Sequence, residues 1–195
     1  MIIQSTQLRC FYIATLFYLS VFSVKAQVVI SGIEMPKDLT YIQAEPLELY
    51  GVGVRKFLWM DMYVGAIFLN EMQLKPNQII EANKPMALRL HILSSLVSNK
   101  RIIKAIQEGF DNSTNGNLHK YQKRIDQMIG YFDEEIQPDD IIDLVYNTSG
   151  NTMIYRNKKQ LGSINGLDFK QALFGVWLSD KAVDSNLKNE LLKGI

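Results

Sequence analysis

The stretch that decides the fold is residues 51–69, which read GVGVRKFLWMDMYVGAIFL. It makes up most of a longer run, residues 47–69, in which β-branched and aromatic residues are frequent and glycines recur. This composition is typical of β-strands. Because a strand usually has about 3–10 residues, a run of this length is too long for a single regular strand.

The path of the chain within this run decides which side chains meet. If the chain turns at residues 58–60, Arg55 lies opposite Tyr63 on the neighbouring strand, and Phe57 lies opposite Asp61. If the run continues straight, Arg55 and Tyr63 share a face but lie about 26 Å apart, at ~3.3 Å per residue. The proposed turn contains no Gly, Pro or Asn. The residues alone therefore leave both geometries open.

The rest of the chain carries further strand and helix patterns. Apolar, β-branched and aromatic runs predict strands at Val28–Ile33, Met86–Ser94, Ile141–Asn147, Thr152–Arg156 and Gln160–Ile164. Apolar stripes at helical spacing predict helices at residues 99–111, 117–133, 167–178 and 185–192. Strands come first, two helices interrupt them, a hairpin returns, and helices close the chain. This order favours an α+β fold, an antiparallel sheet with helices on one face.

The composition is that of an ordinary globular protein with one domain. Of the 195 residues, 47% are hydrophobic and 21% are charged, which excludes disorder, collagen and coiled coils. The formal net charge is +1. Residues 1–26 contain Arg9 and Lys25 and no acid, so the remainder has 19 basic and 20 acidic residues and a net charge of −1. We therefore expect no binding to nucleic acid.

Residues 1–26 are predicted to be a signal peptide that is cleaved after Ala26. The positive charge of Arg9 precedes an apolar run, residues 11–24, and a small residue ends the segment. The alternative is a retained membrane anchor, but a membrane-spanning helix needs about 20 apolar residues and this run is shorter. We expect residues 27–195 to form the mature domain, periplasmic or secreted, without a stable membrane span.

Few residues of the mature domain suggest a metal site. The single cysteine, Cys10, precedes the predicted cleavage site, so disulfides, thiol catalysis and cysteine-ligated zinc are excluded. His91 and His119 have no neighbouring carboxylate pattern, and we interpret them as satisfied or exposed side chains. The acidic residues within 133–140 lack the spacing of an EF-hand, which favours a solvated turn over a calcium site. We expect no metal and no cofactor.

One residue, Arg55, stands out as a candidate for chemistry. The chain contains no G-x-S-x-G, Walker A, H-E-x-x-H or G-x-G-x-x-G motif. Arg55 lies in a strongly apolar strand region, where an unpaired guanidinium would be costly. It therefore requires an anionic partner. Asp61 is the candidate within the protein, and a ligand carboxylate or enolate is the functional alternative.

Residues 51–69 resemble the strand pair of the chalcone isomerase-like family, especially of its secreted bacterial branch. The following strand, the next helix, and the closing strand and helix are similar to residues 86–94 (MALRLHILS), 100–110 (KRIIKAIQEGF) and 160–184 (QLGSINGLDFKQALFGVWLSDKAVD). The resemblance covers about residues 46–192. It implies an open-faced β-sandwich, in which a helical layer covers a large antiparallel sheet and a ligand cleft lies between them. In that family the arginine and the residue opening the second strand face one cleft, which favours the turned geometry.

The resemblance also implies candidate site residues. Chalcone isomerases close a flavanone ring with the help of an arginine, a threonine, a tyrosine and an asparagine. The arginine matches Arg55, and Tyr63 stands at the threonine. The tyrosine and the asparagine fall approximately on Val97 and Lys104, so this chain lacks two of the four polar groups. Because each oxyanion donor supplies about a few kcal/mol, this loss argues against efficient cyclisation.

The non-catalytic, fatty-acid-binding branch of the family uses an arginine and a tyrosine to hold a carboxylate. Arg55 and Tyr63 resemble that pair. We therefore expect the chain to bind a small amphipathic carboxylate, such as a fatty acid, without converting it. The ligand-binding candidates are Arg55, Tyr63, Val97 and Lys104.

An apolar cleft would bury the acyl chain of such a ligand at ~0.8 kcal/mol per methylene. Candidate lining residues are Met62, Val64, Leu90 and Ile92. Two alternatives stay open. One is an isomerase or intramolecular lyase that acts on an enone or a flavonoid-like substrate, with Arg55 and Tyr63 as its catalytic candidates. The other is a structural or interaction module without a ligand.

Overall fold

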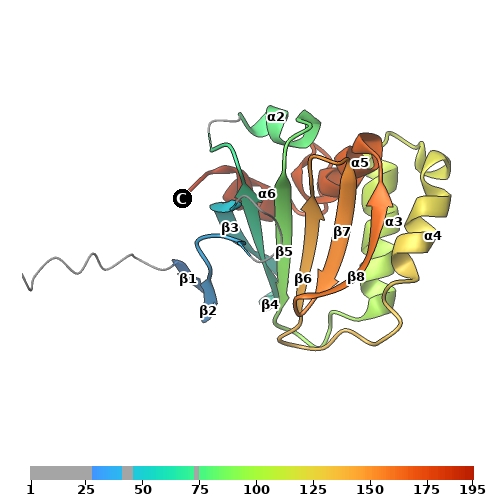
Figure 1. The fold of residues 1–195 in the computed structure, drawn as a ribbon. Helices are drawn as coiled ribbons and strands as arrows, with labels where there is room; N and C mark the ends of the chain where they lie inside the picture. Colours follow the sequence, from blue (N-terminus) through green and yellow to red (C-terminus); the bar gives the residue numbers. More distant parts are fainter. Residues whose placement is uncertain (1–27, 41–45, 73–74) are drawn as a thin grey trace, which may run out of the picture.

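The computed structural model describes residues 28–40, 46–72 and 75–195, and Figure 1 shows its ribbon. Six strands form one antiparallel sheet in the order β3-β4-β5-β6-β7-β8. They are β3 (Glu48–Phe57), β4 (Met60–Leu69), β5 (Met86–Ile92), β6 (Ile141–Tyr146), β7 (Asn151–Arg156) and β8 (Lys159–Asn165). The helices are α2 (Pro76–Glu81), α3 (Asn99–Ser113), the 3-10 helix η1 (Leu118–Lys120), α4 (Gln122–Ile129), α5 (Leu167–Leu178) and α6 (Ser185–Leu192). The predicted signal peptide lies outside the described residues.

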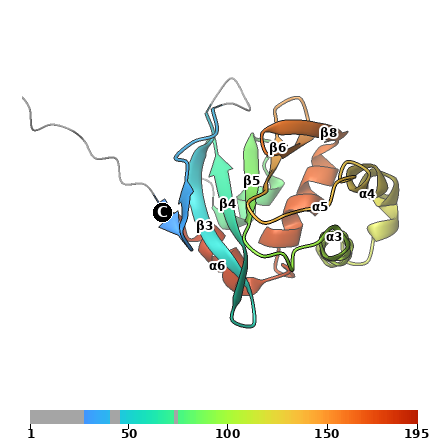
Figure 2. The ribbon, with the colours of Figure 1, turned by 90° about the horizontal axis from the view of Figure 1, so that it is seen from below.

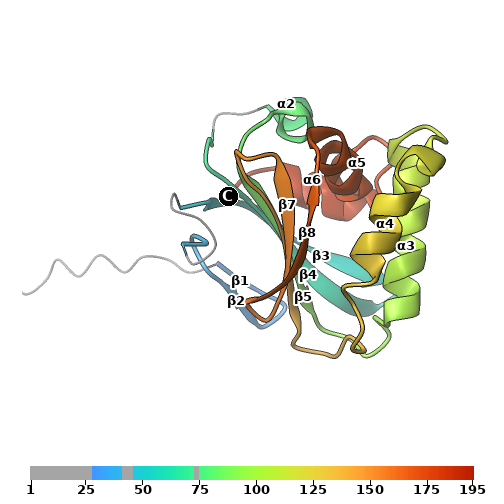
Figure 3. The ribbon, with the colours of Figure 1, turned by 45° about the vertical axis from the view of Figure 1, so that its right-hand side comes forward.

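The two faces of the sheet are covered by different elements. Figures 1 and 3 show α3, α4 and α5 on one face, and a small hairpin of β1 (Val28–Ile30) and β2 (Ile33–Met35) on the other. Each face has its own apolar core, with Leu90 and Phe169 buried on the helical face and Phe68 on the opposite face. The predicted α+β fold, a large antiparallel sheet covered by a helical layer, is confirmed. None of the helices in the described ranges has the length and hydropathy that crossing a membrane requires.

Strands β3 and β4 form a hairpin, so the chain takes the turned geometry. Leu58 and Trp59 connect the strands, and Leu58 adopts the left-handed region at φ 56°. Arg55 pairs with Tyr63 across the two strands, as predicted. Because directly paired residues point to the same face of a sheet, this register places both side chains on the helical face.

The hairpin contains a bulge that shifts its end by one residue. Beyond Arg55 the register changes, and Lys56 pairs with Asp61 while Phe57 pairs with Met60. The prediction that Phe57 faces Asp61 is therefore wrong. The prediction assumed a regular ladder, and a bulge places an extra residue on one strand.

Three elements differ from the sequence predictions. The predicted strand Val28–Ile33 is divided into β1 and β2, because Ser31 and Gly32 both have positive φ, 48° and 78°, and reverse the chain. The predicted helix 117–133 consists of η1 and the shorter α4. Helix α2, which begins at Pro76, was not predicted because it has only six residues, fewer than two turns, and no long apolar stripe.

Glycines let helix α6 pack directly on β3. A Cβ at Gly51 would collide with the backbone of Leu191, and a Cβ at Gly53 would collide with the side chain of Glu190. Glu190 Oε2 also accepts a hydrogen bond from Val54 N at 2.9 Å. The GVG sequence at 51–53 therefore provides close helix–sheet packing, and Figure 2 shows α6 crossing this strand pair.

A buried lysine anchors α2 to the rest of the fold. Lys170 of α5 is fully buried, and its Nζ donates to the carbonyls of Ile79, Ile80 and Ala82 at 3.0, 2.7 and 2.9 Å. These carbonyls lie at the C-terminal end of α2, where helix carbonyls lack partners within the helix. Burial lowers the pKa of Lys170 to about 8.

Candidate functional site

The guanidinium of Arg55 lies at the end of β3 and already contacts a carboxylate. Its Nη1 forms an ion pair with Asp184 Oδ2 and donates to the Lys56 carbonyl at 2.9 Å. Asp184 is the N-cap of α6, and its Oδ1 accepts from Leu187 N at 2.9 Å. One carboxylate therefore holds the start of α6 and orients Arg55.

Asp61, the predicted internal partner of Arg55, has other contacts. Its Oδ2 accepts from Ser31 Oγ at 2.7 Å, and its Oδ1 lies 3.6 Å from Lys56 Nζ. The bulge in the hairpin turns Asp61 toward Lys56. The expectation of an anionic partner for Arg55 is confirmed, but the partner is Asp184.

Tyr63 faces the helical layer next to Arg55. Its hydroxyl oxygen accepts a hydrogen bond from Trp177 Nε1 of α5 at 3.0 Å. Burial, opposed by this bond and by the nearby charge of Arg55, raises the pKa of Tyr63 to about 12. The phenol thus stays protonated at neutral pH, and its hydrogen can point to a third group.

An outer pocket of about 310 Å³ opens beside these two residues. It is lined by Arg55, Phe57, Met62, Tyr63, Leu96, Val97, Arg101, Ile102, Ala105 and Val183. The structure thus brings together three of the predicted ligand-binding residues, Arg55, Tyr63 and Val97. Val97 contributes only an apolar surface and is 5% exposed.

Arg101 is a candidate residue that the sequence reasoning missed. It lies in the first turn of α3, and its Nη1 donates to the Leu96 carbonyl at 3.1 Å. The available signal was its helical position, because Arg101 precedes Ala105 by four residues and such residues share a helix face. Among the described residues that line the outer pocket, Arg101 and Arg55 are the only charged ones.

A smaller inner cavity of about 60 Å³ adjoins the outer pocket. It is lined by Tyr63, Leu90, Ile102, Ala105, Ile106, Met128, Phe132, Ile142, Leu144, Leu173, Val176, Trp177 and Val183. Tyr63, Ile102, Ala105 and Val183 belong to both linings. Apart from the Tyr63 hydroxyl and the Trp177 indole N–H, the side chains of this lining are apolar.

The predicted lining residues are distributed unevenly. Met62 lines the outer pocket and Leu90 lines the inner cavity. Ile92 is buried in the same apolar core but lines neither space. Val64 belongs to the core on the opposite face of the sheet, so its proposed contact with an acyl chain is wrong. Strand alternation explains this, because Val64 and its neighbour Tyr63 point to opposite faces.

Lys104 is the predicted site residue that the structure leaves outside both spaces. Its side chain is 74% exposed, and its Nζ lies 3.5 Å from Glu108 Oε1 on the same helix. Helix geometry gives the reason, since Lys104 lies about 100° around α3 from its pocket-lining neighbour Ala105. We therefore leave Lys104 out of the candidate site.

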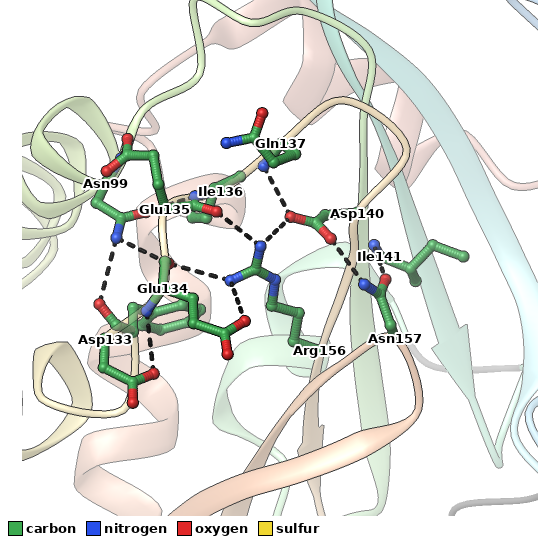
Figure 4. Close-up of polar contacts among 11 residues, drawn as sticks. Asn99, Asp133, Glu134, Glu135, Ile136, Gln137, Asp140, Ile141, Arg156 and Asn157 are labelled. Atoms are coloured by element: carbon green, nitrogen blue, oxygen red, sulfur yellow. Dashed lines mark hydrogen bonds and ion pairs between the residues drawn. The ribbon is translucent and has the colours of Figure 1, made fainter.

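The acidic loop at residues 133–140 is held by Arg156 of β7 and does not form a metal cluster. Figure 4 shows Arg156 donating to the carbonyls of Glu134 and Glu135, at 3.0 and 2.7 Å, and to Asp140 Oδ2 at 2.6 Å. Asn99, at the start of α3, binds the same loop through the Glu134 carbonyl at 3.0 Å. Within the described ranges no three His, Cys, Asp or Glu residues are grouped to hold a metal ion.

The two histidines lie apart from both spaces. His119 is exposed, in agreement with its interpretation from the sequence. His91 is half-buried, and its Nε2 is 3.8 Å from Asp139 Oδ1 without a hydrogen-bond partner among the described residues.

Comparison with known proteins gives two findings. A family model described as chalcone isomerase-like matches residues 27–193. The crystal structure of the fatty-acid binding protein AtFAP1 of Arabidopsis thaliana is similar, with a TM-score of 0.68 and 19% sequence identity, over 86% of this chain and 96% of that chain. At this identity the likeness establishes the fold alone. A search of curated protein sequences finds no significant match.

Proposed function

The chain belongs to the chalcone isomerase-like family, and from this premise we propose that it binds an amphipathic carboxylate, such as a fatty acid, without converting it. The observation that carries the proposal is the junction of two unlike spaces at Tyr63. On one side lies an apolar cavity, and on the other lies a pocket with two guanidinium groups. The similar fold of a plant fatty-acid binding protein supports the same class of ligand.

The charges at the outer pocket are suited to one carboxylate. Arg55 and Arg101 contribute two positive charges, and Asp184 neutralises one of them through its ion pair with Arg55. Both hydrogen bonds of Arg55 to described residues come from Nη1, which leaves Nη2 and Nε as donors for a ligand. Together with the Tyr63 hydroxyl, these donors would hold an anionic head group.

The volumes of the two spaces favour a short or medium acyl chain. The outer pocket, at about 310 Å³, is at the lower end of the ~300–1,000 Å³ that ligand pockets occupy. The inner cavity adds about 60 Å³. We place the head group and the first methylenes in the outer pocket, and the end of the chain in the inner cavity.

The polar groups at the candidate site support binding without turnover. Val97 offers no hydrogen-bond donor, and Lys104 lies outside the pocket, so neither position supplies the phenol or amide that the enzymes of the family use. Tyr63, with its pKa of about 12, is also poorly matched to general-base catalysis near neutral pH.

Calorimetry on a pair of charge variants tests the proposal. Arg101→Gln and Lys104→Gln each remove one positive charge from α3, but only Arg101 lines the pocket. We expect Arg101→Gln to weaken binding of decanoate by ~1 kcal/mol, about fivefold, because a charged hydrogen bond from an exposed side chain is lost. Lys104→Gln should bind decanoate like wild type.

A chain-length series completes the same experiment. From hexanoate upward, affinity should rise by ~0.8 kcal/mol per methylene and level off once the inner cavity is filled. Equal weakening by both variants, or affinity that ignores chain length, would contradict an apolar site with a specific head-group contact. Absence of any binding to wild type would contradict the proposed function altogether.

Two observations favour the alternatives. The Arg55 and Tyr63 donors could also hold an enolate, which favours an isomerase acting on an enone. Turnover of a hydroxylated chalcone that Tyr63→Phe abolishes would support it. The ion pair between Arg55 and Asp184 favours a module in which Arg55 is purely structural, and wild-type protein would then bind no acid in the calorimetric series.

A further inference from the structure

The tip of the β3–β4 hairpin presents three consecutive large apolar side chains to solvent. Phe57 is 51% exposed, Leu58 is 70% exposed and Trp59 is 82% exposed. The other exposed large apolar side chains of the described ranges are Val29, Met72 and Ile195, and no two of them are consecutive in the chain. Figure 2 shows the hairpin projecting beyond the neighbouring strands. Single exposed apolar residues are normal, whereas a contiguous exposed patch marks an interaction site.

The backbone shape of the tip follows from its tight turn, because a two-residue hairpin loop requires positive φ at its first residue. Leu58 adopts φ 56°, a left-handed conformation that costs a non-glycine residue roughly 1 kcal/mol or more. Its side chain is nevertheless 70% exposed. Leu58 and Trp59 are thus both directed to solvent at the tip of the hairpin.

Among the described residues, charges of both signs lie near the tip, and the positive ones, Lys56 and Arg101, outnumber the one acid, Asp61. The side chain of Lys56 is 63% exposed, and Arg101 lines the outer pocket together with Phe57. The nearby acid, Asp61, is bound by Ser31 and Lys56. An apolar tip with a tryptophan and flanking basic side chains matches the interface of an anionic bilayer, where indole rings and lysine stems reach both lipid and water.

We propose that residues 57–59 insert into the interface of an anionic phospholipid bilayer. Insertion would bring the outer pocket to the membrane surface, because Phe57 belongs both to the tip and to the pocket lining. This inference goes beyond the proposed function and holds whatever ligand the cleft takes. The tip is too small for a stable second copy, since its three side chains expose roughly 400 Å² and a specific interface needs about 800 Å² per partner.

Vesicle co-sedimentation tests the insertion. The double variant Leu58→Asn/Trp59→Ser removes the apolar tip and keeps a residue that tolerates the left-handed region at position 58. Val29→Ser, a change at an exposed apolar residue of β1, is the control. Wild type and Val29→Ser should bind vesicles of equal parts phosphatidylcholine and phosphatidylglycerol, and the double variant should bind about tenfold or more weakly.

Three readouts decide the outcome. Wild-type binding should be weaker to phosphatidylcholine alone and at high salt, because charge contributes. Trp59 emission, taken as the difference between wild type and the double variant, should shift to the blue on vesicles. Decanoate affinity without vesicles should be the same in both proteins. All variants carry the same N-terminus, so residues 1–26 contribute equally wherever they are retained.

The proposal is overturned if the double variant sediments as wild type does, or if wild type stays in solution with both vesicle types. Equal binding of wild type to vesicles of phosphatidylcholine alone would contradict the proposed preference for anionic lipid. Association of wild-type chains with one another that the double variant abolishes, without vesicle binding, would assign the tip to a second copy and overturn the membrane proposal. If wild type binds vesicles but does not bind decanoate, this inference stands and the proposed function is contradicted.

Discussion

Two cationic side chains of this domain, Arg55 and Lys170, are partly or fully removed from solvent and therefore need hydrogen-bond acceptors. The acceptor that each one has determines its structural role. Arg55 shares the carboxylate of Asp184 with the first turn of α6, so it is a structural residue as well as a candidate ligand contact. Lys170 has no carboxylate among its contacts with described residues and instead donates to three helix carbonyls. A buried ammonium with neutral acceptors is expected to titrate at lower pH than a solvated one.

Lys170 predicts a specific dependence of stability on pH. Its pKa is lowered by burial from 10.5 to about 8, so between these pH values the unfolded chain binds a proton there and the folded chain does not. The free energy of unfolding therefore rises with pH in this window. Relative to Lys170→Met, wild type should gain on the order of 1–3 kcal/mol between pH 7.5 and pH 10.5.

Urea unfolding of both proteins across this pH range measures the difference. The difference in unfolding free energy between wild type and Lys170→Met removes the contribution of all other titrating groups, including tyrosines, as long as the variant keeps the fold. A wild type that loses stability relative to Lys170→Met as pH rises would show that the three carbonyls hold the charged form more strongly than burial disfavours it. The prediction would then be wrong in sign.

Helix α6 is the element on which the candidate site depends most. It carries Asp184 at its N-cap, and it lies flat on β3 because Gly51 and Gly53 present no side chain there. Glu190 adds a hydrogen bond to the strand backbone. The short helix therefore transmits the packing at its C-terminal end to the orientation of Arg55 at its N-terminal end.

Replacing a single glycine should test this packing. Gly51→Ala places a methyl group against the backbone of Leu191, which cannot move without shifting α6. We expect the free energy of unfolding to fall by ~1–3 kcal/mol, the usual cost of overpacking. Gly130→Ala is the control, because a Cβ there meets only ordinary contacts at 3.5 Å.

Chemical denaturation of both variants gives the comparison. Gly51→Ala should also weaken decanoate binding, since a displaced α6 moves Asp184 and with it Arg55. Equal, small effects of the two substitutions would mean that α6 adapts easily and that its position does not control the site.

At the scale of the whole molecule, the candidate site exists only because distant parts of the chain converge. The hairpin supplies Arg55 and Tyr63, α3 supplies Arg101, and α5 supplies Trp177. The sheet sets these elements side by side on one face, while β1 and β2 cover the other. A cleft between a sheet and its helical layer is a common place for a ligand site.

Export is the prediction that concerns the whole chain. We propose that residues 1–26 are removed during export to the periplasm or the medium, because a charge, an apolar run and a small residue follow in the order that signal peptidase requires. Intact mass spectrometry of the exported protein should show a chain that begins at Gln27. A protein that keeps its N-terminus and fractionates with membranes would contradict both the cleavage and the location.

The sequence by itself determined the class of fold and most of its elements. Apolar, β-branched and aromatic runs located the strands, and helical stripes located the longer helices, because both patterns reflect the burial of a local element. For a chain that turns at residues 58–60, the spacing along the sequence placed Arg55 opposite Tyr63, and the family resemblance favoured that geometry. Ser31 shows the limit of such patterns, since its positive φ divides an apolar run into two strands.

Only the tertiary structure decided which side chains contact one another. Asp184 meets Arg55 across 129 positions of sequence, and Trp177 meets Tyr63 across 114. Arg101 faces the pocket while Lys104, also on α3, faces solvent. The physical reason is that a local pattern fixes which face of an element is buried, whereas the contact across that face depends on how another element packs against it. Here α6 packs closely on β3 because Gly51 and Gly53 have no side chains that would collide with it.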